Sequence, residues 1–160
     1  MSQTNGDEEA RMAQSKVLVV EDNAQNMELL VAYLETLGCQ VRTAADGILG
    51  LEKVRIEPPD LILLDVMMPR MSGFEVCRKL KSDPATRDIP ILMVTALNEL
   101  GDIERGVESG TDDFISKPVN RLELLTRVRS LLRVRHLKNE LERTLAYLND
   151  VETRAGPKRD

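Results

Sequence analysis

Acidic, hydroxyl and ammonium side chains stand where the short apolar runs of this sequence end. Glu21 and Asp22 follow KVLVV, Asp65 follows LILL, Thr95 follows ILMV and Lys117 follows DFIS. Carboxylates held close together repel one another unless a cation lies between them, and oxygen ligands suit Mg²⁺. A lysine and a threonine can contact the oxygens of a phosphoryl group while a carboxylate acts as the nucleophile. These residue types indicate phosphoryl transfer, provided that the fold brings them together.

The elements that must position these residues alternate along the chain. Apolar runs of strand length lie at 16–20, 40–44, 60–64, 90–94 and 113–115. Segments with helical spacing lie at 26–37, 47–55, 73–82 and about 99–109, and a longer one begins near residue 120. This alternation predicts a parallel sheet covered by helices on both faces, with the mostly polar run 40–44 as an edge strand. Because ligands bind beyond the carboxyl ends of such strands, we expect the polar residues to meet at one rim.

Composition narrows the classes of function. The chain has 160 residues, enough for one domain without a disulfide or metal staple, and only two Phe, two Tyr and no Trp. The chain therefore has too few aromatic residues to favour a site that stacks bases or sugars on aromatic rings. The two cysteines suit free thiols in a reducing compartment. No apolar run approaches the roughly 18 residues that span a bilayer, so we expect a cytoplasmic protein without membrane contact.

Four short motifs occur in order along the chain. They are the pair Glu21-Asp22, D-x-x-M-P-x-M-S-G starting at Asp65, T-A starting at Thr95 and K-P starting at Lys117. Together they resemble a bacterial response-regulator receiver domain of the two-component systems, over about residues 16–133. The resemblance implies an α/β fold, a doubly wound five-stranded parallel sheet of order 2-1-3-4-5 like that of flavodoxin.

The resemblance also implies an acceptor and a metal site. Asp65 would be the phosphoacceptor. Mg²⁺, which Mn²⁺ can replace, would be held by Asp22, Asp65 and the backbone carbonyl of Met67, with Glu21 acting through water. A sensor histidine kinase or a phosphotransfer protein would donate the phosphoryl group, and a downstream protein would read the change. The chain would not be an enzyme beyond Mg²⁺-dependent self-phosphorylation and self-dephosphorylation.

The remaining motif residues receive roles in the same way. Thr95 and Lys117 would contact the phosphoryl group, Thr95 and Phe114 would form the switch, and the bond before Pro118 is expected to be cis. A phosphatase acting on external phosphoesters is disfavoured, because no dedicated general base accompanies the motifs.

One departure concerns the lifetime of the phosphorylated state. Met67 and Leu97, each two residues beyond a motif residue, are apolar where a polar side chain could orient an attacking water. We expect slow self-dephosphorylation.

A long helical pattern continues past the end of the resemblance. Its seam has spacings of 3, 4, 3, 4 and 3, as in a heptad repeat, and consists of Val134, Leu137, Leu141, Thr144, Leu148 and Val151. We expect a parallel homodimer through this helix; folding back onto the receiver is the alternative. Similar extensions link receivers to cyclic-di-GMP output domains, but the printed sequence has no GG[D/E]EF or HD-GYP run.

The charge distribution supports one rival function. Residues 1–120 carry 12 Lys and Arg against 21 Asp and Glu, a balance of −9, whereas residues 121–160 carry 10 against 6, a balance of +4. A transcriptional regulator that binds DNA through this basic helix is therefore the alternative. A solvated helix face explains the same charges, and we expect no nucleic-acid contact. The basic cluster is Arg127, Arg129, Arg133, Arg135 and Lys138.

These observations divide the chain into four parts. Residues 1–14 lack apolar periodicity and are expected to be disordered, residues 15–133 form the receiver, 134–153 the helical extension, and 154–160 a disordered tail.

Overall fold

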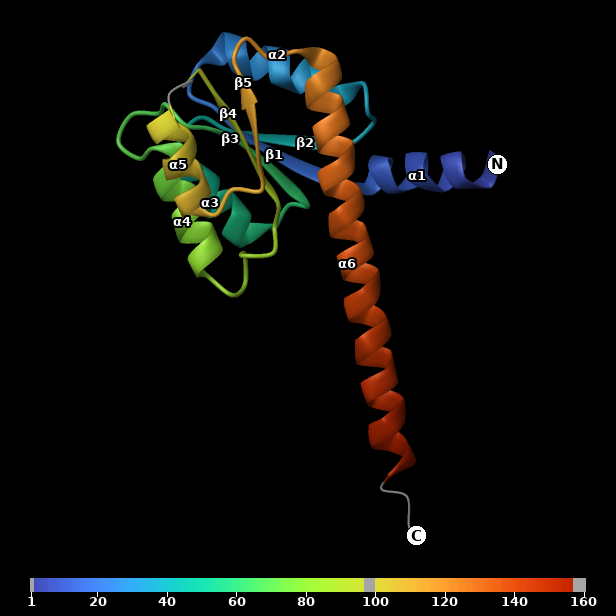
Figure 1. Ribbon diagram of the computed structural model, residues 1–160. Helices are drawn as coiled ribbons and strands as arrows, with labels where there is room; N and C mark the ends of the chain where they lie inside the picture. The colour runs from blue at the N-terminus through green and yellow to red at the C-terminus, as the bar shows by residue number, and fades with distance from the viewer. Residues whose placement is uncertain (1, 97–99, 157–160) are drawn as a thin grey trace.

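The protein, seen here as a computed structural model, is described over residues 2–96 and 100–156. Five strands alternate with helices, and one helix precedes the first strand (Figure 1). The strands are β1 (Lys16–Val20), β2 (Gln40–Ala44), β3 (Leu61–Asp65), β4 (Ile91–Thr95) and β5 (Asp113–Ser116). The helices are α1 (Ser2–Gln14), α2 (Ala24–Glu35), α3 (Gly47–Ile56), α4 (Gly73–Ser82), α5 (Leu100–Ser109) and α6 (Arg121–Ala155).

The strands form one parallel sheet of order β2-β1-β3-β4-β5, which confirms the predicted fold class and the edge position of 40–44. The central strands β3 and β4 are buried at every residue because helices cover both faces. Both strands run one residue further than their apolar runs suggested. Asp65 and Thr95 are therefore the last residues of their strands, inside the hydrogen-bonded sheet.

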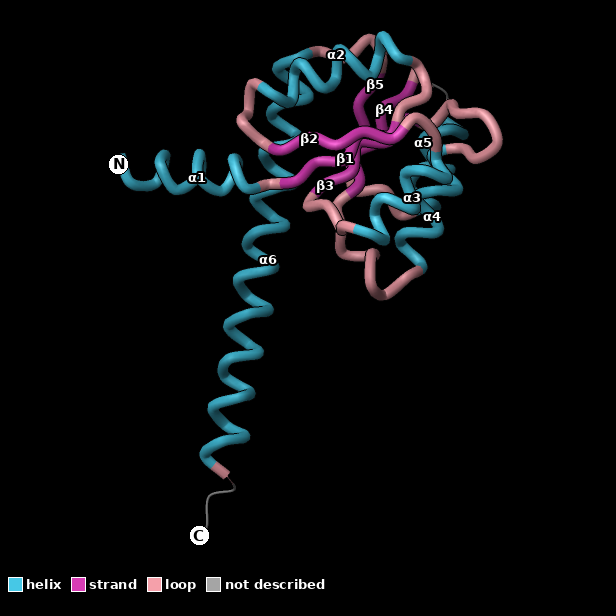
Figure 2. Tube along the Cα trace, turned by 180° about the vertical axis from the view of Figure 1, so that it is seen from behind, coloured by secondary structure: helices cyan, strands magenta, loops and turns pink. Residues whose placement is uncertain are grey.

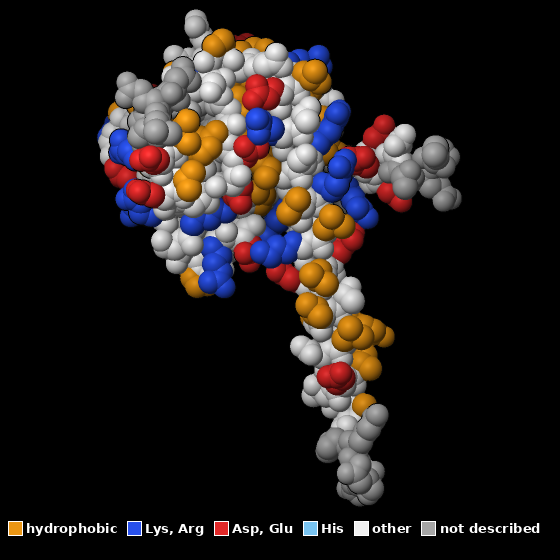
Figure 3. Space-filling view, in the orientation of Figure 1, with side chains coloured by type: hydrophobic (Ala, Val, Ile, Leu, Met, Phe, Trp, Pro, Cys, Tyr) orange, Lys and Arg blue, Asp and Glu red, His pale blue; other side chains and the backbone are white. Residues whose placement is uncertain are grey.

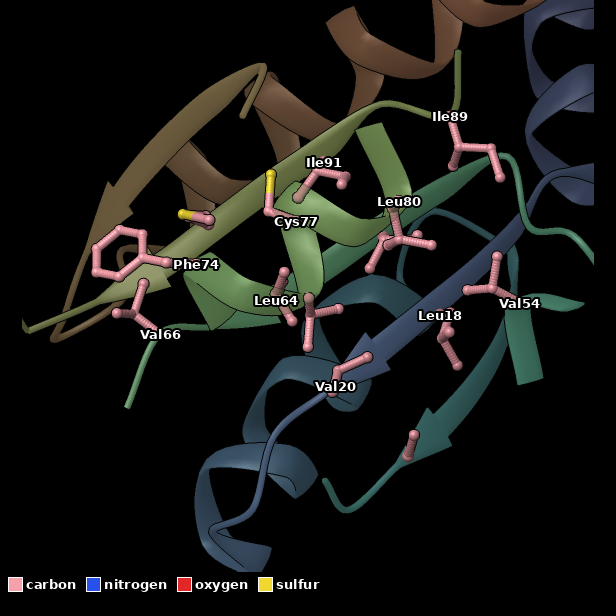
Figure 4. Close-up of a cluster of buried hydrophobic side chains, with 14 of the residues drawn as sticks. Leu18, Val20, Val54, Leu64, Val66, Phe74, Cys77, Leu80, Ile89 and Ile91 are labelled. Carbon is pink, nitrogen blue, oxygen red and sulfur yellow. The ribbon is translucent and has the colours of Figure 1, made fainter. Parts of the chain in front are cut away.

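Successive side chains of each strand point to opposite faces of the sheet, so the strands contribute to two separate cores, one on each face. On one face Leu18, Leu64 and Ile91 pack against α3 and α4, as Figure 4 shows, and Ile62 belongs to the same core. On the other face the intervening residues pack against α2 and the first turns of α6, and Figure 2 shows the course of both helices. The free thiols of Cys39 and Cys77 lie within these cores. The helices therefore hold the sheet from both sides and leave the carboxyl ends of the strands as the open rim.

The expected disorder of residues 1–14 is wrong, because Ser2–Gln14 is helical. This segment docks on α6: Glu8 pairs with Arg133 at 2.7 Å and Arg11 with Glu140 at 3.0 Å. Met12 is buried in the core on that face. A short polar helix is marginal alone, and these partners lie more than 120 residues away in the sequence, where local periodicity gives no sign of them.

Helix α6 runs without a break past the expected receiver boundary. Asn120 caps its start by accepting a hydrogen bond from the N–H of Glu123, and the helix ends at Gly156, whose φ is +69°. The helix thus includes residues 154–155 of the expected disordered tail, while residues 157–160 of that tail lie outside the described residues. Leu132 is fully buried, whereas Val134 is 62% exposed. The last turns of the helix therefore project from the domain as an arm (Figure 1). No helix in the described ranges is long and apolar enough to cross a membrane.

Candidate functional site

The polar residues that follow the strands do meet at one rim of the sheet. One ligand oxygen from each of Glu21, Asp22 and Asp65 lies within 4.8 Å of the others. The Nζ atom of Lys117 lies 3.2 Å from Asp65 Oδ1 and 3.4 Å from Glu21 Oε1. Three carboxylates therefore face one ammonium group, which leaves an excess of negative charge.

Backbone contacts fix the rim in place. The N–H of Glu21 donates to Ala44 O at 3.1 Å, and the N–H of Lys117 donates to Thr95 O at 2.8 Å, so β-pairing continues into the site. The bond between Lys117 and Pro118 is cis, as expected.

A glycine shapes the loop behind the acceptor. The N–H of Gly73 donates to Val66 O at 2.9 Å, and a Cβ on Gly73 would meet Asp65 O at 2.3 Å. Only glycine allows the start of α4 to approach the end of β3 this closely. Met67 lies on this loop with its side chain 63% exposed.

Burial sets the chemistry of Asp65. Its side chain is only 3% exposed. Desolvation, reinforced by the charge of Glu21 and opposed by Lys117, raises the pKa of Asp65 from 3.8 to about 6. Near neutral pH the carboxylate is therefore ionised but poorly compensated, which favours an incoming cation.

Glu21 carries a buried oxygen suited to a cation or to a water bound to one. Its Oε1 accepts from Asn26 Nδ2 at 3.0 Å, whereas its buried Oε2 has no hydrogen-bond partner among the residues that the structure describes. A buried oxygen without a partner is costly unless water or an ion supplies one. Asp22 is exposed and offers the carboxylate on the solvent side. Sequence reasoning missed Asn26, although its position on the first turn of α2, five residues after Glu21, was the available signal.

The expected switch residues occupy neighbouring strands. Thr95 is buried at the end of β4, with a 5% exposed fraction. Phe114 is half-buried on β5 against α5, where a Cβ on Gly106 would meet its ring at 2.0 Å. The ring thus fills the space that this glycine leaves. Leu97, which together with Met67 led to the expectation of slow self-dephosphorylation, lies outside the described residues.

A doubly wound parallel sheet with an acidic cluster and a lysine at its carboxyl rim defines a class of signalling domain. The sequence matches the family "Response regulator receiver domain" over residues 17–129. The chain belongs to this family, as the four motifs indicated.

Known proteins agree with this assignment. The response regulator PleD of Caulobacter vibrioides is 49% identical over 127 residues, 79% of this chain and 28% of PleD. The DNA-binding dual master transcriptional regulator RpaA of Synechocystis is 43% identical over 118 residues, 74% of this chain and 49% of RpaA. The chain thus spans half or less of the length of these relatives.

Solved structures agree as well. The receiver domain of a histidine kinase from Syntrophus aciditrophicus has a TM-score of 0.71 at 38% identity, covering 74% of this chain and 90% of that one. The receiver domain of the sensor histidine kinase PA1611 from Pseudomonas aeruginosa has a TM-score of 0.70 at 31% identity, covering 74% and 98%. The latter structure has a magnesium ion coordinated in its active-site cleft.

Proposed function

We propose that this chain is a phosphoacceptor response regulator in which Asp65 receives a phosphoryl group from a phosphohistidine of a kinase or phosphotransfer protein. An oxygen of the Asp65 carboxylate attacks phosphorus, the P–N bond breaks, and the imidazole of the donor leaves with the electron pair. The observation that carries the proposal is the buried, undercompensated Asp65 carboxylate, with Lys117 Nζ 3.2 Å away.

The other groups at the rim support the transfer. Lys117 stabilises charge on one phosphoryl oxygen as a point charge, and the hydroxyl of Thr95 donates to another. Asp22, Asp65, the backbone carbonyl of Met67 and, through water, Glu21 would hold Mg²⁺ or Mn²⁺. The unpartnered Oε2 of Glu21 and the excess of carboxylates fit such an ion. When bound, the ion would neutralise the charge that develops on the phosphoryl oxygens.

The change would then be read through contacts that differ between the two states. The acyl phosphate offers new contacts to Thr95 and Lys117, and movement of Thr95 makes room for Phe114 to turn inward. A downstream protein, or a second copy bound through the exposed arm of α6, would read the altered surface. We propose no catalytic activity beyond self-phosphorylation and self-dephosphorylation.

The experiment is phosphorylation by a small donor such as phosphoramidate, followed by intact mass measurement. With Mg²⁺ the chain is expected to gain one phosphoryl group, and chelation of Mg²⁺ is expected to abolish the gain. Asp65→Asn should gain none, whereas Asp150→Asn, which changes an exposed aspartate on the arm, should behave as the wild type. Full phosphorylation of Asp65→Asn would overturn the proposal.

The DNA-binding alternative receives less support from the contacts of the basic cluster. Arg127 pairs with Asp113 at 2.6 Å, Arg133 with Glu8 at 2.7 Å and Lys138 with Asp88 at 2.7 Å. Three of the five cations are thus offset by carboxylates of the same chain. Salt-dependent retention of the chain on DNA at low ionic strength would revive this alternative.

A further inference from the structure

The arm of α6 carries an apolar stripe that its own receiver does not cover. Leu124, Val128 and Leu132 are fully buried against the sheet, but the same face continues with Arg135 and Asn139, which are polar. The new stripe begins on another face, about 150° around the helix at roughly 100° per residue. It is exposed by 51–62% at each member: Val134, Leu137, Leu141, Leu145 and Leu148. Figure 3 shows apolar side chains along the arm.

The stripe includes Leu145, which the heptad spacing left out in favour of Thr144. Both residues lie beside the line through Leu141 and Leu148, one on each side, and Leu145 is the apolar one. With Leu145 the successive steps are 3, 4, 4 and 3 residues. The four steps cover 14 residues and average 3.5, so the stripe keeps the heptad period and over this length differs from the heptad seam only in using position 145 in place of 144.

The same spacing is symmetric about Leu141. If a second α6 runs in the opposite direction, Leu141 meets its own copy, Leu137 meets Leu145, and Val134 meets Leu148. These five residues then face one another, whereas Val151 of the heptad seam, 43% exposed near the end of the arm, has no counterpart in this pairing. A parallel, in-register pair would also match the stripe, so the charges beside it must decide the direction.

The charges of the arm change sign along its length. Residues 127–138 hold five Lys and Arg and no acid, whereas 139–152 hold four Asp and Glu and one Arg. Parallel packing places the two basic segments side by side. Antiparallel packing places each basic segment against the acidic one and opposes the helix dipoles. Lys138, which pairs with Asp88 of its own chain at 2.7 Å, then also lies beside Glu142 of the second copy.

We infer that two copies of this chain associate through an antiparallel contact of their α6 arms centred on Leu141, with Leu145 in the contact and Thr144 outside it. This inference rests on the dimerisation proposed above, and it replaces the parallel seam expected from the heptad count. The two receivers then lie at opposite ends of the paired arms.

Disulfide cross-linking of the full chain tests the direction. Cysteines can be joined only when their Cα atoms approach within about 7 Å. Leu141→Cys is expected to cross-link with itself on oxidation, and a mixture of Val134→Cys and Leu148→Cys to form the mixed dimer. Neither of those two variants should cross-link alone. The wild type controls for Cys39 and Cys77, which are 7% and 0% exposed.

The outcomes distinguish the antiparallel direction of the contact from dimerisation itself. Self-cross-linking of Val134→Cys would keep the dimer but overturn its antiparallel direction. A monomeric wild type in light scattering, with no cross-linking of Leu141→Cys, would overturn both. In either case the proposal that Asp65 is phosphorylated is tested separately, by the intact mass measurement described above.

A matched pair of serine variants tests the stripe itself. Leu145→Ser removes one buried leucine from each copy and is expected to raise the dimer dissociation constant by about a hundredfold. Thr144→Ser, at the neighbouring position, should leave it unchanged, with the helix content of both variants checked by circular dichroism. If Thr144→Ser weakened the dimer and Leu145→Ser did not, the contact would include Thr144 and exclude Leu145.

Discussion

The ionised Asp65 is expected to destabilise the folded protein when no metal is bound. Burial and Glu21 raise the pKa of Asp65 from 3.8 to about 6, so the folded state holds its proton more tightly than the unfolded state does. Between about pH 4 and pH 6 the unfolded chain releases this proton first, and stability therefore falls as pH rises. Above about pH 7 the full cost is present.

The perturbation that exposes this cost is Asp65→Asn, which resembles the protonated acid in shape. At ~1.36 kcal/mol per pH unit, the difference between 3.8 and about 6 corresponds to about 3 kcal/mol. The variant should thus be more stable by up to about this amount at pH 8. For a chain of this size that corresponds to an increase in Tm of about 6–12 °C. Lys117 keeps Glu21 as a partner at 3.4 Å, so the variant does not leave the ammonium group unpaired.

The assay is urea or thermal unfolding of both proteins in chelator from pH 8 to pH 4. The difference in free energy of unfolding should be largest at pH 8 and vanish near pH 4, where the wild type is itself protonated. Asp150→Asn, with its exposed carboxylate, should show no such pH dependence. An Asp65→Asn variant that is less stable than the wild type at pH 8 would refute the reasoning.

Four further outcomes are expected. Mg²⁺ should raise the Tm of the wild type at pH 8 and raise it much less in Asp22→Asn, as a titration followed by thermal unfolding would show; equal shifts would remove Asp22 from the metal site. Gly106→Ala should destabilise by about 1–3 kcal/mol in urea unfolding, because the new Cβ meets the Phe114 ring at 2.0 Å; the usual gain from alanine in a helix would contradict this packing. The phosphorylated wild type should decay slowly and Met67→Asn faster, in a mass time course; a wild-type half-life of seconds would exclude the slow-decay hypothesis. Met12→Ser should speed amide exchange in α1 without changing phosphorylation, and unchanged exchange would show that burial of Met12 does not hold α1 in place.

The sequence alone predicted the sheet and most of the rim, for a local reason. In a parallel sheet every strand ends at the same edge, so a residue that directly follows an apolar run has its place decided by that run. This rule alone predicted that Asp65 and Thr95 lie at the rim. It predicted the same position for Lys117, because a short strand precedes it. The cis bond at Pro118 came from the family resemblance.

Only the tertiary structure decided the features that depend on distant partners. Residues 2–14 form a helix because α6, more than 120 residues later, supplies Arg133, Glu140 and a core for Met12. The raised pKa of Asp65 arises from its burial at the end of β3 and from the charge of Glu21, which follows the neighbouring strand β1.

The face of α6 that the arm exposes was decided in the same way. A heptad count places Thr144 in the seam because it uses spacing alone. The structure shows which face the receiver already covers, and the exposed leucines that remain identify the stripe through Leu145. The order of residues along the chain thus determined the chemistry at the rim. Burial between distant segments determined that residues 2–14 form a helix and which face of α6 is exposed.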